Sequence, residues 1–298
     1  MPMILTPGSI SSDNSDKNVN SKKAEIITVA SGKGGVGKTL FSINFAIEAK
    51  ALGKKILLMD ADLGLANVHI MAGVYPEHDL MDVMNSKKDI KDIIVKGPGG
   101  IDIIPGASGI FQLSNMTHNR RQGLVQQLTE LEDKYDLIII DTEAGISHNV
   151  IKFISIADRV VIVTTPDLTA LADAYATIKV VVSKKANDNI GVVVNRVKSA
   201  SEANMIFRKI SMAADKFLDF KLRNYSHIME DAMVVREAIQ DRKPIALHYS
   251  KSRAGSSIKE VFCTVFRVDQ AKPTETKAMF NRFSKLLENM RAKQTVSV

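Results

Sequence analysis

The 298-residue chain has a single cysteine, Cys263, and no tryptophan. One cysteine cannot form an internal disulfide, so nothing in the composition suggests an oxidising, secreted setting. The chain also lacks an apolar run of the roughly 18 residues that a membrane-spanning helix needs. Residues 1–23 lack the apolar core of a signal peptide. These absences make a cytoplasmic protein the default expectation.

The composition is that of an ordinary globular protein, with 45% hydrophobic and 24% charged residues. This is enough material for one large α/β domain. Residues 1–23 are rich in Ser, Asn, Asp and Lys, and we expect a disordered tail there. No internal repeat is visible, so we assign residues 24–268 to one domain and residues 269–298 to a basic C-terminal segment.

Short β-branched runs alternate with helical patterns along the central domain. The runs are apolar on both faces, as strands of a parallel sheet covered by helices would be. This alternation predicts an α/β fold with a doubly wound, mostly parallel sheet and helices on both faces. The predicted strands are 25–30, 56–59, 101–104, 137–140, 160–164 and 190–194, with a weaker candidate at 220–228. The predicted helices are 38–52, 120–133, 147–155, 168–183, 201–218, 233–240 and 256–266.

A glycine-rich segment follows the first predicted strand and leads directly into a predicted helix. Glycines let backbone N–H groups approach phosphate oxygens, and the helix N-terminus adds its positive end. This strand–loop–helix context is that of a P-loop, so we predict that the segment and Leu40 bind the phosphates of ATP. We expect Lys38 to reach the β- and γ-phosphates and the Thr39 hydroxyl to bind Mg²⁺. The segment reads Gly32-Lys33-Gly34-Gly35-Val36-Gly37-Lys38-Thr39.

Carboxylates follow two of the predicted strands. Asp60 and Asp62 come directly after the run at 56–59, and Asp141 follows the run at 137–140. Ligands of doubly wound sheets bind beyond the carboxyl ends of the strands. We expect Asp60 and Asp141 to hold or orient Mg²⁺, and Asp62 to position a water in line with the γ-phosphate. The alternative role for the Asp60 and Asp62 pair is to cap the strand end.

Asn195 and Arg196 follow the predicted strand at 190–194. An asparagine amide at this edge can read a purine base through paired hydrogen bonds. We therefore include Asn195 and Arg196 in the predicted nucleotide site. A strand cap is the alternative role for Asn195.

Lys33, a second lysine inside the loop, makes residues 33–39 resemble the deviant Walker A motif of the MinD/ParA family of ATPases. Residues 60–67 resemble switch I of that family, D-x-D-x-G-L-x-N, and residues 141–145 resemble its switch II, D-[ST]-x-A-G. The resemblance covers roughly residues 24–255. It implies a homodimer formed with ATP, in which Lys33 reaches the partner's phosphates, Asp62 and Lys38 support hydrolysis, and Asn195 contacts adenine.

Two positions depart from the family pattern. Leu40 stands where many relatives carry a threonine, and the loss of one hydroxyl contact costs only ~1 kcal/mol, so binding should survive. Glu143 stands in switch II where close relatives carry Gly, Pro or Ala. Its carboxylate could repel the γ-phosphate, contact water or pair with a lysine. We hypothesise that it weakens or retunes ATP hydrolysis.

Residues 225–244 and residues 141–147 resemble the FlhG (FleN, YlxH) branch of the family, which controls flagellar number and placement and pairs with the GTPase FlhF. This makes an FlhF-like GTPase and flagellar C-ring or regulator proteins candidate partners. The branch's N-terminal D-Q-A-x-x-L-R motif is absent from residues 1–23. A MinD-type division-site ATPase, a ParA-type DNA partition ATPase and a binding module with structural ATP remain alternatives.

The C-terminal segment combines positive charge with an apolar stripe. Residues 271–298 contain six basic and two acidic residues. Their net charge of +4 is more than half of the +7 of the whole chain. We predict a basic amphipathic helix that lies in the membrane interface at the inner face of the cell membrane; a helix packed on the domain is the alternative. Dimerisation with ATP would add avidity to such a helix. DNA binding would not require the stripe, so it is less favoured. The stripe is Met279, Phe283, Leu286, Leu287 and Met290.

Overall fold

The computed structural model describes residues 23–62, 64–106 and 118–267. These residues form an eight-stranded sheet with the strand order β3-β4-β2-β5-β1-β6-β7-β8. Neighbouring strands run parallel except at β3 and β4, which are antiparallel. The strands are β1 (Glu25–Ser31), β2 (Ile56–Ala61), β3 (Val95–Lys96), β4 (Asp102–Ile104), β5 (Leu137–Ala144), β6 (Arg159–Thr164), β7 (Ile190–Val197) and β8 (Arg223–Met229).

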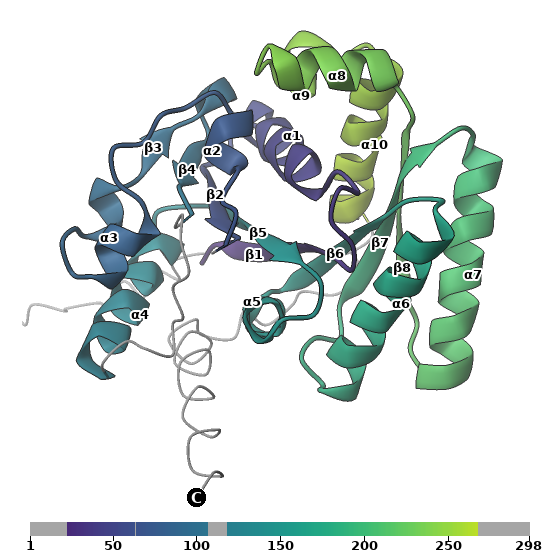
Figure 1. The fold of residues 1–298 in the computed structure, drawn as a ribbon, viewed down its shortest axis with the longest axis horizontal. Helices are drawn as coiled ribbons and strands as arrows, with labels where there is room; N and C mark the ends of the chain where they lie inside the picture. The colour runs from purple at the N-terminus through teal and green to yellow at the C-terminus, as the bar shows by residue number, and fades with distance from the viewer. Residues whose placement is uncertain (1–22, 63, 107–117, 268–298) are drawn as a thin grey trace, which may run out of the picture.

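Helices cover both faces of this sheet (Figure 1). Helix α1 follows the first strand, and α10 lies beside it on the same face, whereas α5 lies on the opposite face. Short 3₁₀ turns occur at Ile90–Asp92 and Pro98–Gly100. The α-helices are α1 (Lys38–Ala51), α2 (Val68–Met71), α3 (Leu80–Met84), α4 (His118–Glu132), α5 (His148–Ile156), α6 (Leu168–Ser183), α7 (Ala200–Leu218), α8 (Ala232–Gln240), α9 (Ile245–His248) and α10 (Arg253–Arg267).

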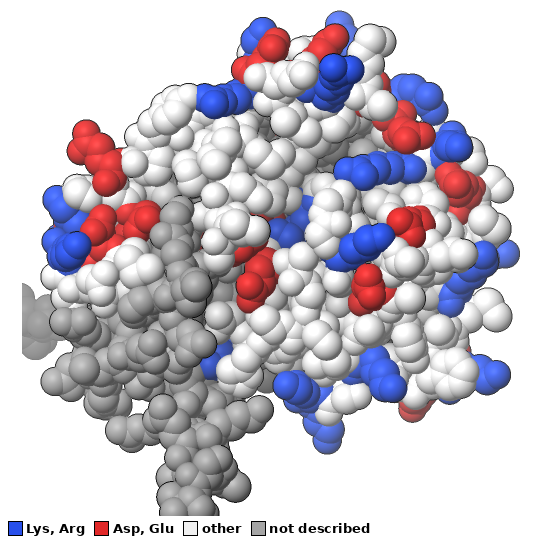
Figure 2. Space-filling model, in the orientation of Figure 1, with Lys and Arg blue, Asp and Glu red and all other residues white. Residues whose placement is uncertain are grey.

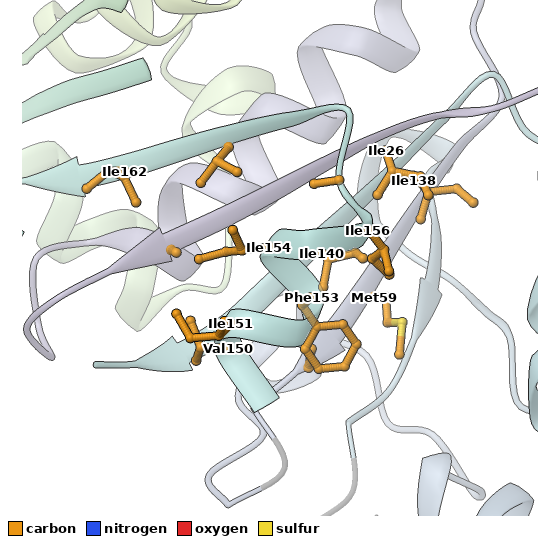
Figure 3. Close-up of a cluster of buried hydrophobic side chains, with 14 of the residues drawn as sticks. Ile26, Met59, Ile138, Ile140, Val150, Ile151, Phe153, Ile154, Ile156 and Ile162 are labelled. Atoms are coloured by element: carbon orange, nitrogen blue, oxygen red, sulfur yellow. The ribbon is translucent and has the colours of Figure 1, made fainter. Parts of the chain in front are cut away.

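The apolar runs of the strands serve two separate cores. Successive side chains point to opposite faces, so Ile26 of β1 packs toward α5 while Ile27 packs toward α1. Figure 3 shows the first core, in which Phe153 and Ile154 of α5 lie against Ile140 of β5 and its neighbours. Each fully buried aliphatic or phenyl side chain contributes about 1.5–3 kcal/mol. Burial on both faces explains why the strands lack a polar alternation.

The second core fixes the helix that starts at the phosphate loop. The Phe45 ring of α1 lies 5.2 Å from the Phe41 ring and 5.3 Å from the Phe262 ring of α10, measured between centroids. Phe262 in turn lies 4.8 Å from Phe266. Helix α1 therefore packs against both the sheet and the neighbouring α10, and its N-terminal end has a fixed position relative to the strand ends.

The predicted fold class is confirmed. Within the described residues, every strand and helix predicted for the central domain is present, with ends shifted by up to four residues. The antiparallel β3 and the short helices α2, α3 and α9 were not predicted, because segments of two to five residues show too little periodicity. Helix α10 begins three residues earlier than predicted, at Arg253, so its first turn includes Gly255.

Two predicted segments lie outside the described residues. These are the N-terminal tail, apart from Lys23, and the C-terminal amphipathic helix with its apolar stripe. Within the residues that the structure does describe, no helix is both long and apolar enough to cross a bilayer.

Candidate functional site

The phosphate loop and both acidic segments lie at one edge of the sheet. Strand β5 lies between β1 and β2, and its register pairs Asp141 with Asp60 of β2 and Ala144 with Ser31 of β1. The N–H of Gly145 donates to the Ser31 carbonyl at 2.8 Å. Three chain segments that are distant in sequence therefore meet where β1 enters the loop.

The loop geometry requires glycine at two positions. A Cβ on Gly32 would lie 2.2 Å from the Asp173 carbonyl oxygen of α6, and one on Gly37 would lie 2.5 Å from Nδ2 of Asn195. Gly37 also has a φ of 91°, and it is the N-cap of α1 without a side-chain hydrogen bond to the helix. The first N–H groups of α1 are thus left for an anion, and the loop has the form of a phosphate cradle.

A buried cluster of polar side chains closes the base of this cradle. Lys38 Nζ donates to Asp141 Oδ1 at 3.0 Å, and the Thr39 hydroxyl donates to Asp141 Oδ2 at 2.7 Å. The Lys38 side chain is 8% exposed and that of Asp141 only 1%, so each buried charge has its countercharge. The Ser42 hydroxyl also donates to Asp141 Oδ1, at 2.7 Å. The sequence reasoning missed Ser42, although it lies one helical turn after Lys38 on the same face.

This cluster suits Mg²⁺. The Thr39 hydroxyl and the Asp141 carboxylate are hard oxygen donors that already lie 2.7 Å apart. Within the described ranges, no three His, Cys, Asp or Glu side chains form a ready-made metal cage. Mg²⁺ rarely needs such a cage, because it keeps several waters and takes further ligands from substrate phosphates.

Asp60 organises the segment that follows β2. Its fully buried carboxylate accepts hydrogen bonds from the N–H groups of Asp62 (3.1 Å), Asn67 (2.9 Å) and Val68 (3.0 Å). Burial, followed by the charge of Asp141, raises the pKa of Asp60 to about 7. Asp60 therefore fixes the backbone at residues 62, 67 and 68, beside Asp141.

Asp62 belongs to that same segment. Its Oδ1 accepts hydrogen bonds from the N–H groups of Leu65 (2.9 Å) and Gly64 (3.3 Å). The carboxylate is half-buried and turned back onto its own segment. If the segment keeps this conformation, only Oδ2 of Asp62 is left to hold a water at the γ-phosphate.

Lys33 lies at the surface and is bound within its own chain. Its Nζ donates to Asp167 Oδ2 at 3.2 Å and also to the Thr169 hydroxyl. The two charged side chains are 40% and 53% exposed. Asp167 is the N-cap of α6, where its Oδ1 accepts from the Thr169 N–H at 2.8 Å. The hydrogen bonds from Thr169, and then that from Lys33, lower the pKa of Asp167 to about 2. Asp167 and Thr169 were missed, although the pattern Asp167-x-Thr169 is an N-cap signal.

Asn195 and Arg196 lie beside a cavity of about 290 Å³ at the start of α1. The Asn195 amide donates to the Val36 carbonyl at 2.7 Å and accepts from the Arg196 N–H at 2.9 Å. Asn195 thus packs across the loop, with its amide at the rim of the cavity. Mostly apolar walls with a few polar groups are typical of sites for small molecules and cofactors. The walls include Leu40, Phe41, Ile228, Ala232 and Ile258.

Glu143, the unusual residue of switch II, contacts the start of α5. Its carboxylate accepts a hydrogen bond from the Ser147 hydroxyl. Ser147 is the N-cap of α5, and its hydroxyl oxygen accepts from the Val150 N–H at 3.3 Å. The structure therefore gives this carboxylate a defined partner outside the loop.

The sequence of the chain is similar to a described protein family and to several described proteins. A family profile described as an AAA domain (AAA_31) matches residues 24–192. The antiactivator FleN of Pseudomonas aeruginosa is 35% identical over 237 residues, which is 80% of this chain and 84% of FleN. The flagellum site-determining protein YlxH of Helicobacter pylori is 31% identical over 226 residues, covering 75% of this chain and 76% of YlxH.

A solved structure extends the comparison to three dimensions. The septum site-determining protein MinD of Pyrococcus horikoshii, complexed with Mg-ADP, is 26% identical and superposes with a TM-score of 0.67. The alignment covers 84% of this chain and 99% of that structure. The likeness extends over almost the whole of the MinD structure.

Proposed function

The chain belongs to the MinD/ParA family of P-loop ATPases, close to its FlhG (FleN, YlxH) branch, and from this premise we propose that it is an ATP-driven switch. It dimerises with ATP, associates with the membrane and regulates flagellar number or placement. The observation that carries this proposal is the pair of lysines in one loop. Lys38 is buried on Asp141, whereas Lys33 lies at the surface where a second chain can approach.

Nucleotide binding follows from the cradle. The loop from Gly32 to Thr39, with Leu40, holds the phosphates, and Asn195 and Arg196 border the cavity that takes the base. Thr39 and Asp141 hold Mg²⁺, directly or through water, beside Asp60. When bound there, Mg²⁺ would supply positive charge that offsets the negative charge of the phosphates. P. horikoshii MinD is described as complexed with Mg-ADP, which supports a nucleotide with Mg²⁺ as the ligand.

Hydrolysis needs a positioned water and stabilised negative charge more than a strong base. Asp62 orients the water, and its place beside Asp60 in the loop after β2 supports that role. Lys38 stabilises the charge that develops at the β- and γ-phosphates. Lys33 adds a further positive charge from the partner chain.

Dimerisation requires Lys33 to change partner. In the described chain, Asp167 and Thr169 hold its ammonium group. To reach the phosphates of a second chain, Lys33 must leave both. The exchange is feasible because exposed ion pairs contribute little free energy.

The flagellar role rests on FleN and YlxH, which are described as an antiactivator and a flagellum site-determining protein. Candidate partners are an FlhF-like GTPase and C-ring or regulator proteins. Membrane association rests on the C-terminal stripe, at the inner face of the cell membrane. A MinD-type division-site role is the second candidate, favoured by the match to P. horikoshii MinD. DNA partition is less favoured: on the face in Figure 2, basic and acidic side chains are interspersed rather than separated.

The test begins with the Asp62→Ala variant, which should bind ATP and accumulate as a dimer. Light scattering after size exclusion, with ATP and with ADP, measures this directly. A variant that stays monomeric with ATP would contradict the switch. Liposome flotation of the full chain should then show more binding with ATP than with ADP. Counting flagella and septa in a deletion strain separates the flagellar role from the division-site role.

A further inference from the structure

Within the described residues, three side chains from the first two turns of α1 donate hydrogen bonds to Asp141. Its Oδ1 accepts from Lys38 Nζ at 3.0 Å and from the Ser42 hydroxyl at 2.7 Å. Its Oδ2 accepts from the Thr39 hydroxyl at 2.7 Å. A carboxylate can accept about four hydrogen bonds, so the three donors act together rather than in competition.

A bound nucleotide would engage two of these donors. The proposed function places Lys38 Nζ at the β- and γ-phosphates and the Thr39 hydroxyl oxygen at Mg²⁺. When Lys38 turns to the phosphates, Oδ1 of Asp141 loses the hydrogen bond of 3.0 Å. Ser42 lies one turn farther into α1 and is fully buried, so its hydroxyl does not reach a ligand in the cradle. It therefore stays on Oδ1 whether or not nucleotide is bound.

The Ser42 hydroxyl has a second acceptor within reach, the Lys38 carbonyl oxygen at 3.1 Å. A hydroxyl carries a single proton, so it can favour only one of the two acceptors. Donation to the carbonyl four residues earlier is common for a serine inside a helix, and that bond alone would make Ser42 purely structural. The Asp141 oxygen is nearer and charged, and a hydrogen bond to a charged group is roughly twice as strong as a neutral one. The proton therefore belongs to Asp141.

We propose that Ser42 is a positioning residue for Mg²⁺, because it holds Oδ1 of Asp141 after Lys38 has turned to the phosphates. With Oδ1 held, Oδ2 stays beside the Thr39 hydroxyl, and these two oxygens are the ones that suit the metal. The proposal rests on the proposed function, which places the nucleotide and Mg²⁺ in this cradle. It adds a residue that touches neither of them but orients a ligand of the metal.

The expected size follows from the way metal sites respond when their ligands lose support. Removing a group that orients a metal ligand typically weakens metal binding by about 10-fold to 100-fold. Because the Thr39 hydroxyl still contacts Oδ2, we expect a loss near the lower end, about 10-fold. Nucleotide binding without the metal should hardly change, since Ser42 is buried behind the cradle.

The experiment measures how much Mg²⁺ improves nucleotide binding. Titration calorimetry gives the Kd of ADP in EDTA and in saturating Mg²⁺, and the ratio of the two constants reports the contribution of the metal. The variants are Ser42→Ala, which removes the hydroxyl, and Ser42→Thr, which keeps one. Thr177→Val is the matched control, because Thr177 is a fully buried helical residue whose hydroxyl donates to the Asp173 carbonyl, four residues earlier, at 2.9 Å.

Ser42→Ala should lower the ratio about 10-fold while its Kd for ADP in EDTA stays within about threefold of the wild type. Ser42→Thr and Thr177→Val should keep the wild-type ratio. A purely structural role would weaken binding equally with and without Mg²⁺, so an unchanged ratio in Ser42→Ala would overturn the proposal. An equal fall in Ser42→Ala and Ser42→Thr would also overturn it, because packing rather than the hydroxyl would then decide the ratio.

The wild-type measurement separates this proposal from the proposed function. If the wild-type chain binds no ADP, or binds it equally well with and without Mg²⁺, the placement of nucleotide and metal fails. If Mg²⁺ tightens ADP binding to the wild type and to Ser42→Ala by the same factor, the positioning role of Ser42 alone fails.

Discussion

The two lysines of the phosphate loop lie five residues apart and have opposite environments. Lys38 is 8% exposed and is bound to an aspartate that is 1% exposed, whereas Lys33 is 40% exposed and is bound to one that is 53% exposed. Both ion pairs are of similar length, 3.0 Å and 3.2 Å. Distance alone therefore does not distinguish them, but burial does.

Because of this difference in burial, the Lys38 pair contributes to the stability of the fold, whereas the Lys33 pair can be exchanged when the protein changes state. Breaking a buried pair leaves an unpaired charge away from water and costs several kcal/mol. An exposed pair can exchange its partner at little cost, because water solvates both groups. The same loop thus carries one lysine fixed for phosphate binding and one that is able to leave its own chain.

The largest effect is expected for Lys38→Ala. Asp141 would remain buried without its countercharge, which should lower the free energy of unfolding by about 3–5 kcal/mol. ATP turnover should fall by at least about 100-fold, because a positioned donor to the phosphates is lost. Urea unfolding and a phosphate-release assay measure the two effects. Lys91→Ala is the control, since Lys91 is an exposed lysine in a surface pair with Asp89; an equal loss there would remove the distinction.

Lys33→Ala should separate binding from turnover. ADP affinity should change by less than about threefold, while ATP turnover and ATP-dependent dimerisation fall about tenfold to 100-fold. The urea midpoint should hardly move, because the pair with Asp167 is exposed. Turnover that survives intact in Lys33→Ala would show that the surface lysine does not act across a dimer.

The surroundings of the buried Lys38 could be predicted from the sequence better than those of the exposed Lys33. The order of strands and helices and the convergence of Lys38, Asp60 and Asp141 follow from apolar runs and from what comes after each strand. The partner of Lys33 did not follow, because Asp167 lies 134 residues away and only the packing of α6 brings it to the loop. Ser42 was missed for a related reason: the sequence puts it one helical turn after Lys38, but its contact with Asp141 depends on how α1 packs against β5.

Asp60, beside the buried pair of Lys38 and Asp141, and Asp167, the exposed partner of Lys33, should make the free energy of unfolding depend on pH in opposite directions. Asp60 has a pKa of about 7, above the ordinary 3.8, so between these values the folded chain keeps a proton that the unfolded chain has lost. Its contribution to stability is full below pH 4 and disappears as the pH rises through 7. The pKa of Asp167 is lowered to about 2, so its contribution is full above pH 4 and is lost as the pH falls toward 2.

Urea unfolding of the nucleotide-free chain in EDTA, from pH 4 to pH 8, should reveal the contribution of Asp60. Stability should decrease across this range by about 2–4 kcal/mol more in the wild type than in Asp60→Asn. The asparagine oxygen can still accept from the N–H groups of Asn67 and Val68, but the amide loses the hydrogen bond from Asp62 and cannot ionise. Parallel pH profiles for the two proteins would show that Asp60 does not carry a raised pKa.

The smallest and most specific effect is expected for Asp167→Asn. Asparagine is an equally good N-cap for α6, so the helix should keep its start, but Lys33 loses the charge that holds it in its own chain. Half-maximal dimerisation with ATP should then occur at about threefold to tenfold lower protein concentration. The helix-capping control is Asp79→Asn, because Asp79 caps α3 through the Met81 N–H at 2.7 Å and is remote from Lys33 in the loop.

Sedimentation of both variants with ATP, in the Asp62→Ala background, gives the two dimerisation constants without hydrolysis. The comparison of the lysines depends on the outcome. If Asp167→Asn dimerises more readily than Asp79→Asn, the intramolecular pair competes with the pairing between chains. If Asp167→Asn dimerises less readily, Asp167 itself belongs to the dimer interface, and the exposed pair serves to assemble the dimer rather than to delay it.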